Sequence, residues 1–125
     1  MKQRKIQHEA MEQEKLFRWA FYMSAKYPDL AFLFHIPNGG SRNKIEAFNL
    51  KKQGVKAGVP DVCLPVPSGK YHGLYIEMKY DKNKPTENQR KRLKFLSDKR
   101  YAVKVCYNWQ DAAESICKYL NIPFN

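Results

Sequence analysis

Two short apolar segments separated by a tight turn place the strongest constraint on the fold of this chain. Residues 61–66 and 73–80 are rich in strand-forming side chains, and Pro67-Ser68-Gly69-Lys70 between them is typical of a turn. The two segments are therefore expected to pair as a β-hairpin. In such a hairpin Asp61, at the start of the first strand, lies near the end of the second strand, where Glu77-Met78-Lys79 stands.

The rest of the pattern predicts an α/β fold in which a mixed central sheet is flanked by helices. No internal repeat or interdomain linker is visible, so residues 1–125 are expected to form a single domain with its core at about 9–120. Ser41 or Asn43 can cap the second helix, and Gly54 suits its end. Besides the hairpin, we expect helices over 9–26, 44–53, 86–98 and 109–120, and strands over 30–36 and 101–106.

The charge of the chain points to a class of partner. Lysine and arginine outnumber the acidic residues 23 to 12, which gives a formal net charge of +11 spread over the whole length. A basic protein gains affinity for nucleic acid by neutralising phosphates, so the charge predicts a polyanionic partner. A basic surface that only keeps the protein dissolved is the alternative.

Cysteine and hydropathy patterns exclude several classes of protein. Cys63, Cys106 and Cys117 are widely spaced and form no C-x-x-C pair, so we expect buried thiols in a reducing cytoplasm. The three histidines are equally scattered, which disfavours a zinc cluster. No window of eighteen apolar residues occurs, and the N-terminus continues into polar sequence, so neither a membrane-spanning nor a secreted protein is expected.

Asp61, Glu77 and Lys79 carry the side chains that phosphodiester hydrolysis requires. Because side chains alternate along a strand, Glu77 and Lys79 face the same side, and the hairpin brings Asp61 to them. Two carboxylates can hold a hard cation such as Mg²⁺, which polarises a phosphoryl oxygen and acidifies a bound water. Lys79 can orient that water and offset the charge that grows on phosphorus. The residues predict a metal nuclease, with a surface ion pair between Glu77 and Lys79 as the alternative.

The motif is weak when taken alone, as a second Pro-Asp in the same chain illustrates. Pro28-Asp29 also precedes an apolar segment, but no acid-x-lysine follows it nearby. Glu77-Met78-Lys79 is the only acid-x-lysine in the sequence, and it ends a strand just after the Asp61 strand. This context favours Pro60-Asp61 over Pro28-Asp29.

The first helix offers a third acid for the same site. At the helical rotation per residue, Glu9 and Glu12 fall within about 60° of the centre of the apolar stripe near Leu16, whereas Glu14 points away. Either Glu9 or Glu12 can therefore complete or extend the metal shell.

Four parts of the sequence are more specific than the acidic pair: residues 36–42 (IPNGGSR), 54–61 (GVKAGVPD), 73–79 (GLYIEMK) and Gln89. Together they closely resemble the virus-type replication-repair nuclease (VRR-NUC) domain of the PD-(D/E)xK nuclease superfamily. The resemblance covers about residues 9–120 and suggests the stand-alone kind of domain found in phages.

The resemblance implies an α-β-β-β-α-β core and dependence on Mg²⁺ or Mn²⁺. It implies that Asp61 and Glu77 are metal ligands, that the backbone carbonyl of Met78 joins them, and that Lys79 is the catalytic lysine. A family glutamate on the first helix matches Glu9, with Glu12 close behind. Further matches are Gln89, near the active site, and Asn38 and Arg42, in a glycine-rich turn that contacts DNA. On local grounds alone, Gln89 is also explained as a helix cap with Thr86, and the turn by backbone freedom.

Stand-alone members of this family are thought to be homodimeric, structure-selective endonucleases similar to Holliday-junction resolvases. The resemblance thus implies a DNA endonuclease acting on branched DNA in replication, repair or recombination within a phage-infected cell. Nicking, flap cutting, end trimming and a catalytically inactive DNA-binding module are the alternatives. Five lysines on a helix and loop near the site are expected to contact DNA phosphates: Lys44, Lys51, Lys52, Lys82 and Lys84.

Overall fold

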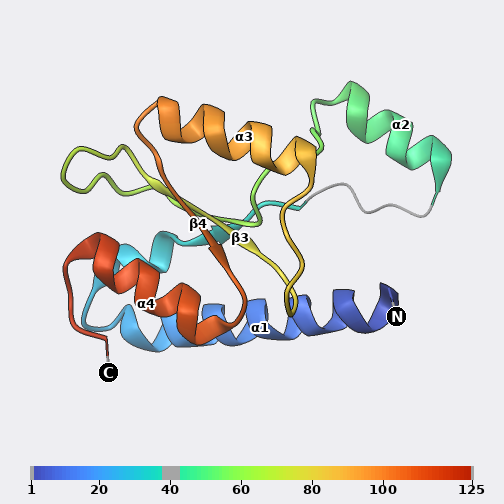
Figure 1. Cartoon of the computed structure of the whole chain (residues 1–125). Helices are drawn as coiled ribbons and strands as arrows, with labels where there is room; N and C mark the ends of the chain where they lie inside the picture. Colours follow the sequence, from blue (N-terminus) through green and yellow to red (C-terminus); the bar gives the residue numbers. More distant parts are fainter. Residues whose placement is uncertain (1, 38–42, 125) are drawn as a thin grey trace.

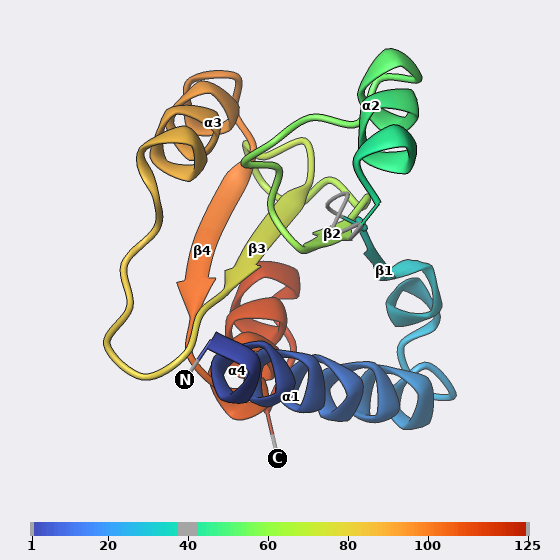
Figure 2. The ribbon, with the colours of Figure 1, turned by 90° about the vertical axis from the view of Figure 1, so that its right-hand side faces the viewer.

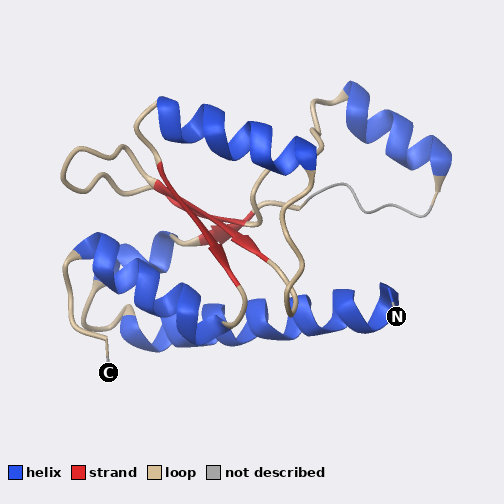
Figure 3. Cartoon of the chain, viewed as in Figure 1, coloured by secondary structure: helices blue, strands red, loops and turns tan. Residues whose placement is uncertain are grey.

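The computed structural model describes residues 2–37 and 43–124, and a four-stranded mixed sheet lies at its centre (Figure 3). The strands are β1 (Phe34–His35), β2 (Val62–Leu64), β3 (Leu74–Met78) and β4 (Ala102–Cys106), in the spatial order β1-β2-β3-β4. Neighbours pair antiparallel except β3 and β4, which are parallel. The expected mixed sheet and the β2–β3 hairpin are therefore confirmed.

Helices cover both faces of this sheet. Figures 1 and 2 show α1 (Lys2–Met23) and α4 (Trp109–Leu120) on one face and α3 (Glu87–Asp98) on the other. The apolar side chains of β2 and β3 alternate toward the face that α1 and α4 cover, which creates one hydrophobic core. Its fully buried members include Leu16 of α1, Val62 and Leu64 of β2, Leu74 and Ile76 of β3, and Ile116 of α4.

The expected buried strand over 30–36 is wrong in most of its length. Pro28–Phe32 forms a 3-10 helix (η1) with proline in its first turn, and only the two residues Phe34–His35 pair with β2. Leu30 and Leu33 are buried, whereas the aromatic rings of Phe32 and Phe34 are exposed. An unbroken apolar run does not distinguish a buried strand from a short helical turn, so the pattern misled the assignment.

The ends of several elements also differ from expectation. Helix α1 begins at Lys2, not near residue 9, because its first residues are polar but favour helix, and an apolar stripe does not mark such a start. It ends at Met23, three residues before the expected end at 26. Strands β2 and β3 are shorter than the segments 61–66 and 73–80. Helix α4 and the end of α3 lie where the sequence predicted them.

Helix α2 (Lys44–Lys52) stands away from the sheet and has no buried residue (Figure 1). Asn43 caps its start, since the side-chain oxygen accepts hydrogen bonds from the N–H groups of Ile45 and Glu46. Gly54 follows its end with φ +104°, a conformation that favours glycine. The expected cap at Asn43 and terminator at Gly54 are confirmed, while the alternative cap Ser41 lies outside the described residues. None of the described helices combines the length and apolar character needed to cross a bilayer.

Candidate active site

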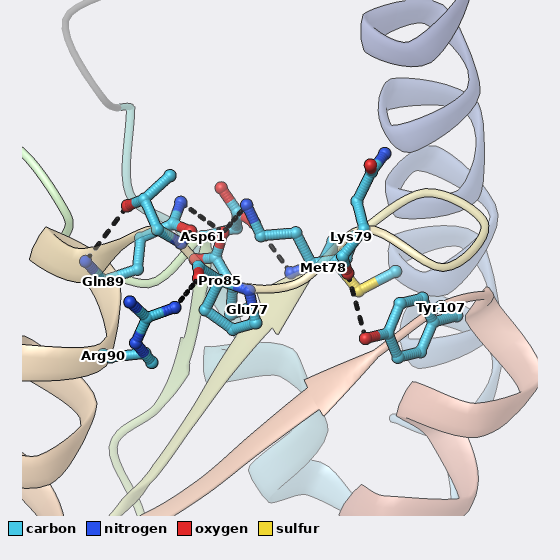
Figure 4. Close-up of polar contacts among 10 residues, drawn as sticks. Asp61, Glu77, Met78, Lys79, Pro85, Gln89, Arg90 and Tyr107 are labelled. Atoms are coloured by element: carbon cyan, nitrogen blue, oxygen red, sulfur yellow. Dashed lines mark hydrogen bonds and ion pairs between the residues drawn. The ribbon is translucent and has the colours of Figure 1, made fainter.

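The register of the β2–β3 hairpin brings Asp61 to the end of β3. Val62 lies opposite Ile76, so the next position of the ladder places Asp61 beside Glu77. Oδ2 of Asp61 accepts a hydrogen bond of 2.8 Å from the N–H of Met78 (Figure 4). This bond continues the hairpin past Val62, the first residue of β2, and fixes the Asp61 carboxylate beside the end of β3.

Glu77 and Lys79 project from the same side of β3, as alternation requires. The Nζ atom of Lys79 lies 3.6 Å from Oε2 of Glu77, and the two residues are only 6% and 3% exposed. The N–H of Lys79 donates to the carbonyl of Cys106 on β4, which anchors the backbone at this point. Both side chains are buried, so the ion pair that they form does not lie at the surface.

Gln89 connects helix α3 to the carboxylate of Glu77. Its Nε2 donates a hydrogen bond of 2.8 Å to Oε2 of Glu77, while its Oε1 accepts one from the N–H of Thr86 (Figure 4). The hydroxyl of Thr86 in turn accepts from the N–H of Gln89, which completes a capping box. The interpretation of Gln89 as a helix cap is confirmed, and the same amide also holds the buried carboxylate of Glu77.

The two glutamates of the first helix differ in their surroundings. Both carboxylate oxygens of Glu12 are occupied, Oε1 by the N–H of Trp109 at the start of α4 and Oε2 by the ammonium of Lys15. Although burial opposes them, these two donors lower the pKa of Glu12. Glu12 thus joins α1 to α4 through its carboxylate.

The charge of Glu9 interacts with those of Asp61 and Glu77. Burial raises its pKa, with a further contribution from Asp61, while the charges of Lys5 and Lys79 act in the opposite direction. Its Oε2 atom is buried and has no hydrogen-bond partner among the described residues. A buried carboxylate oxygen that accepts no hydrogen bond lowers the stability of the fold unless a cation or a water molecule binds to it.

The carboxylates of the site are held in a strongly unfavourable electrostatic environment. Burial, followed by the negative charge of Asp61, raises the pKa of Glu77 to about 8, although Lys79 opposes the shift. Burial also raises the pKa of Asp61, against the N–H of Met78 and the charges of His35 and Lys79. Oε1 of Glu77, like the Glu9 oxygen, is buried and accepts no hydrogen bond from any described residue. Such a set of groups is suited to a divalent cation, which favours the charged form of both acids.

Within the described part of the chain, no three histidine, cysteine or acidic side chains gather closely enough to hold a metal ion by themselves. The candidate ligands are therefore the Asp61 and Glu77 carboxylates together with a backbone oxygen. The carbonyl of Met78 faces the same strand neighbour as its N–H, because both groups of a strand residue point to one side, and that N–H meets Asp61. Met78 thus presents a carbonyl beside the two acids.

The expected DNA contacts are spread around this site. All five lysines are exposed: Lys44, Lys51 and Lys52 on α2, and Lys82 and Lys84 on the loop between β3 and α3. Asn38 and Arg42 lie outside the described residues. The hydroxyl of Tyr107 donates a hydrogen bond of 3.0 Å to the carbonyl of Asn83 and so holds the loop between β3 and α3.

Two contributors to the site were missed from the sequence. Nδ1 of His35 on β1 lies 2.8 Å from the carbonyl oxygen of Asp61, so β1 supports the residue that precedes β2. Gly58 has φ +81°, and a Cβ atom there would lie 2.8 Å from the backbone oxygen of Asn88 on α3. The glycine two residues before Pro60-Asp61 is the sequence signal that could have indicated this close approach. No comparable signal in the sequence indicated the contact of His35.

Comparison with known proteins places this geometry in a family. The family model described as the VRR-NUC domain matches residues 2–109. A solved structure titled "VRR_NUC domain protein" is similar with a TM-score of 0.77 and 29% sequence identity, over 92% of this chain and 89% of that chain. No curated protein matches the chain. Since the match spans most of the sequence and includes Asp61, Glu77 and Lys79, the chain belongs to the VRR-NUC domain family and is a nuclease of the PD-(D/E)xK type.

Proposed function

We propose that this protein is a Mg²⁺- or Mn²⁺-dependent, structure-selective DNA endonuclease, similar to Holliday-junction resolvases, that acts in phage DNA replication, repair or recombination. The observation that carries the proposal is the cluster of half-buried Asp61 with buried Glu77 and Lys79, in which two acids share a site that raises the pKa of each. Groups held in this way at a structural cost are typical of active sites. The three described cysteines are free and buried, which supports action in a reducing cytoplasm.

The donor set fits a hard divalent cation. Asp61, Glu77 and the Met78 carbonyl would hold it, with Glu9 completing the shell through water. When bound, such an ion supplies polarisation of the scissile phosphate and a more acidic water. The unpartnered oxygens of Glu77 and Glu9 support this assignment, because both lack a donor of their own among the described residues.

Lys79 and Gln89 prepare the site for the reaction. Lys79 is held by Glu77, so its ammonium has a fixed position from which it can orient an attacking water and stabilise negative charge on phosphorus. Gln89 restrains the Glu77 carboxylate and thereby positions it. Because Gln89 acts through Glu77, we treat it as a positioning residue.

DNA is proposed to approach the end of the sheet where these residues lie. Figure 2 shows α2 and the loop between β3 and α3 on opposite sides of that end, and the five exposed lysines named above lie on these two elements. Phosphate contacts from both sides position a duplex without reading its sequence. Asn38 and Arg42 are proposed as further contacts on the family resemblance.

A homodimer is part of the same proposal, because two related sites permit paired cuts across a junction. The aromatic side chains of Phe21 and Phe32 are 74% and 66% exposed, on α1 and η1 respectively. Between these elements lies a largely apolar hollow of about 340 Å³ lined by Phe17, Phe21, Leu30 and Leu33 among others. Exposed aromatic rings beside an apolar hollow favour an interface between copies.

Cleavage of a panel of labelled DNAs tests the function. We expect Mg²⁺- or Mn²⁺-dependent cutting of a four-way junction in preference to flap, splayed-arm, duplex and single-stranded DNA. Asp61→Ala, Glu77→Ala and Lys79→Ala are each expected to lower the rate about 100-fold or more. Asp29→Ala, at the other Pro-Asp of the chain, is the matched control and keeps full activity.

Other outcomes separate the remaining functions. Preferential cutting of flaps, nicks or free ends would replace the junction specificity by that activity. Binding without cleavage of any DNA in either metal would favour a DNA-binding module. Full cleavage by a variant of Asp61, Glu77 or Lys79 would refute the site itself.

A further inference from the structure

A groove crosses the free edge of the sheet at β4, away from the acidic site. Figure 1 shows β4 running between α3 and α4. One hollow of about 400 Å³ lies here, with a second hollow of about 410 Å³ beside it, and Tyr71 and Ser97 line both. We refer to the two together as the β4-edge groove. Its aromatic and basic lining residues are Tyr71, Tyr101 and Tyr119 with Lys70, Arg100, Lys104 and Lys118.

The β4-edge groove is built for a polyanion. Lys70, Arg100, Lys104 and Lys118 come from four different parts of the chain, yet none of the described residues that line the groove is acidic. The acid nearest to it on α3, Asp98, is paired with Lys94 at 3.0 Å and does not line either hollow. Cations gathered from separate segments without compensating acids attract phosphate groups.

Three tyrosine rings distinguish this groove from a merely basic surface. The rings of Tyr71 and Tyr119 pack with centroids 6.2 Å apart, and Tyr101 packs on Tyr75 at 5.5 Å. The hydroxyl of Tyr119 donates to the carbonyl of Val66 at 2.6 Å, which fixes that ring. The Lys70 ammonium lies over the Tyr71 ring, 5.5 Å from its centroid, so an unpaired base that stacks on this ring takes the place of that lysine. The bases of a duplex already stack on one another and gain less from such a ring.

We propose that the β4-edge groove binds a single-stranded segment of the nucleic acid on which this nuclease acts. The inference rests on the proposed function and narrows its substrate to DNA that carries an unpaired strand. Strand β3 begins at the groove with Leu74 and ends at the catalytic Glu77 and Met78, so the two sites are separated by about 10–15 Å along it. One DNA molecule can therefore occupy both.

Binding of a short fluorescein-labelled oligothymidylate, followed by fluorescence anisotropy in EDTA, tests the groove without any cleavage. The double variant Lys104→Glu and Lys118→Glu is expected to weaken binding about tenfold or more. Arg18→Glu on α1 with Lys26→Glu in the turn after it is the matched control, because it changes the net charge equally at exposed positions outside the groove. The control should weaken binding by less than about threefold.

Tyr71 tests the stacking part of the inference independently of charge. Tyr71→Ala is expected to weaken binding about fivefold or more, while Tyr71→Phe keeps the ring and binds like the unmodified protein. Equal weakening by the two charge-reversed double variants would overturn the proposal, since binding would then follow net charge alone. Competition by polyglutamate as effective as that by unlabelled oligothymidylate would overturn it as well, in favour of an acidic protein partner.

Failure of this inference is distinguishable from failure of the proposed function. Loss of nuclease activity in Asp61→Ala and Glu77→Ala is measured with metal, whereas oligothymidylate binding is measured without it. Normal cleavage with unchanged oligothymidylate binding in Tyr71→Ala would refute binding at the β4-edge groove and leave the proposed active site unaffected.

Discussion

Nε2 of Gln89 on α3 donates a hydrogen bond of 2.8 Å to Oε2 of Glu77 on β3, and this bond links the helix that covers the sheet to the acid near the end of the strand. The same oxygen lies 3.6 Å from the ammonium of Lys79. One carboxylate oxygen of Glu77 is thus held by two donors, while the other, Oε1, is left unpartnered within the described structure. The described residues thus leave this second oxygen of Glu77 without a donor.

Gln89→Ala should reduce cleavage about 10- to 100-fold, because groups that orient a ligating carboxylate have effects of this size. Thr86→Ala is the matched control: it removes the other half of the capping box but leaves the bond from Gln89 to Glu77. Both variants weaken the start of α3, so both should lose about 1 kcal/mol of folding free energy. Equal cleavage rates for the two variants would show that Gln89 only caps its helix.

The stability of the metal-free protein should fall as the pH rises from about 4.5 to about 8. The pKa of Glu77 is raised from 4.5 to about 8 in the folded chain, so the stability linked to its proton is complete below pH 4.5 and is lost as the pH rises through 8. Glu77→Gln removes the charge and should flatten this part of the profile. Urea unfolding in EDTA at several pH values measures the difference, and parallel profiles for the two proteins would contradict the shift.

Metal should stabilise the protein through Glu9 and not through Glu12. We expect Mg²⁺ or Mn²⁺ to raise the melting temperature of the unmodified chain, and to have little effect on Asp61→Asn or Glu77→Gln, because a ligand stabilises only the fold that binds it. Glu9→Gln should weaken the metal-dependent shift.

Glu12→Ala provides the comparison for Glu9. It should lower the folding free energy by about 1–3 kcal/mol, because the N–H of Trp109 loses its acceptor at the start of α4. Its response to metal should be preserved. A lost metal response in Glu12→Ala with an intact response in Glu9→Gln would reverse the assignment.

Gly58→Ala should both destabilise the fold and impair cleavage. The added Cβ meets the backbone oxygen of Asn88 at 2.8 Å, and the loop that carries Asp61 has to move from α3 to relieve the contact. Gly54→Ala has a similarly positive φ but no atom within 4 Å of its Cβ, so it should cost only the backbone strain, about 1–2 kcal/mol. Thermal unfolding and cleavage rates compare the two, and equal losses would exclude a role for the close approach.

Phe21→Asp combined with Phe32→Asp should convert a dimer into a monomer, because charges at the centre of an apolar interface are strongly unfavourable. Phe48→Asp on α2, another exposed aromatic position, is the control and should leave the dimer intact. Size-exclusion chromatography with light scattering measures the mass of each. A monomeric unmodified protein would remove the dimer from the proposed function.

The sequence by itself determined the hairpin, the mixed sheet and the identity of Asp61, Glu77 and Lys79. Alternation along a strand and the turn at 67–70 are local features, and they were sufficient to predict that these side chains meet at the end of the hairpin. The capping box of Thr86 and Gln89 was equally local. Residues 30–36 were assigned incorrectly because an apolar run satisfies both strand and helix.

Only the tertiary structure gives the two glutamates of α1 different surroundings. Glu9 and Glu12 lie on neighbouring positions of the same helix face, so periodicity treats them alike. The start of α4, almost a hundred residues away in the sequence, donates the N–H of Trp109 to the Glu12 carboxylate. One oxygen of Glu9, by contrast, has no hydrogen-bond partner in the described part of the chain. The raised pKa of Glu77 is likewise a result of packing, because the sheet and α3 remove its carboxylate from water beside Asp61. Local periodicity specifies which side chains share a face, but long-range contacts decide which of them remain free to bind.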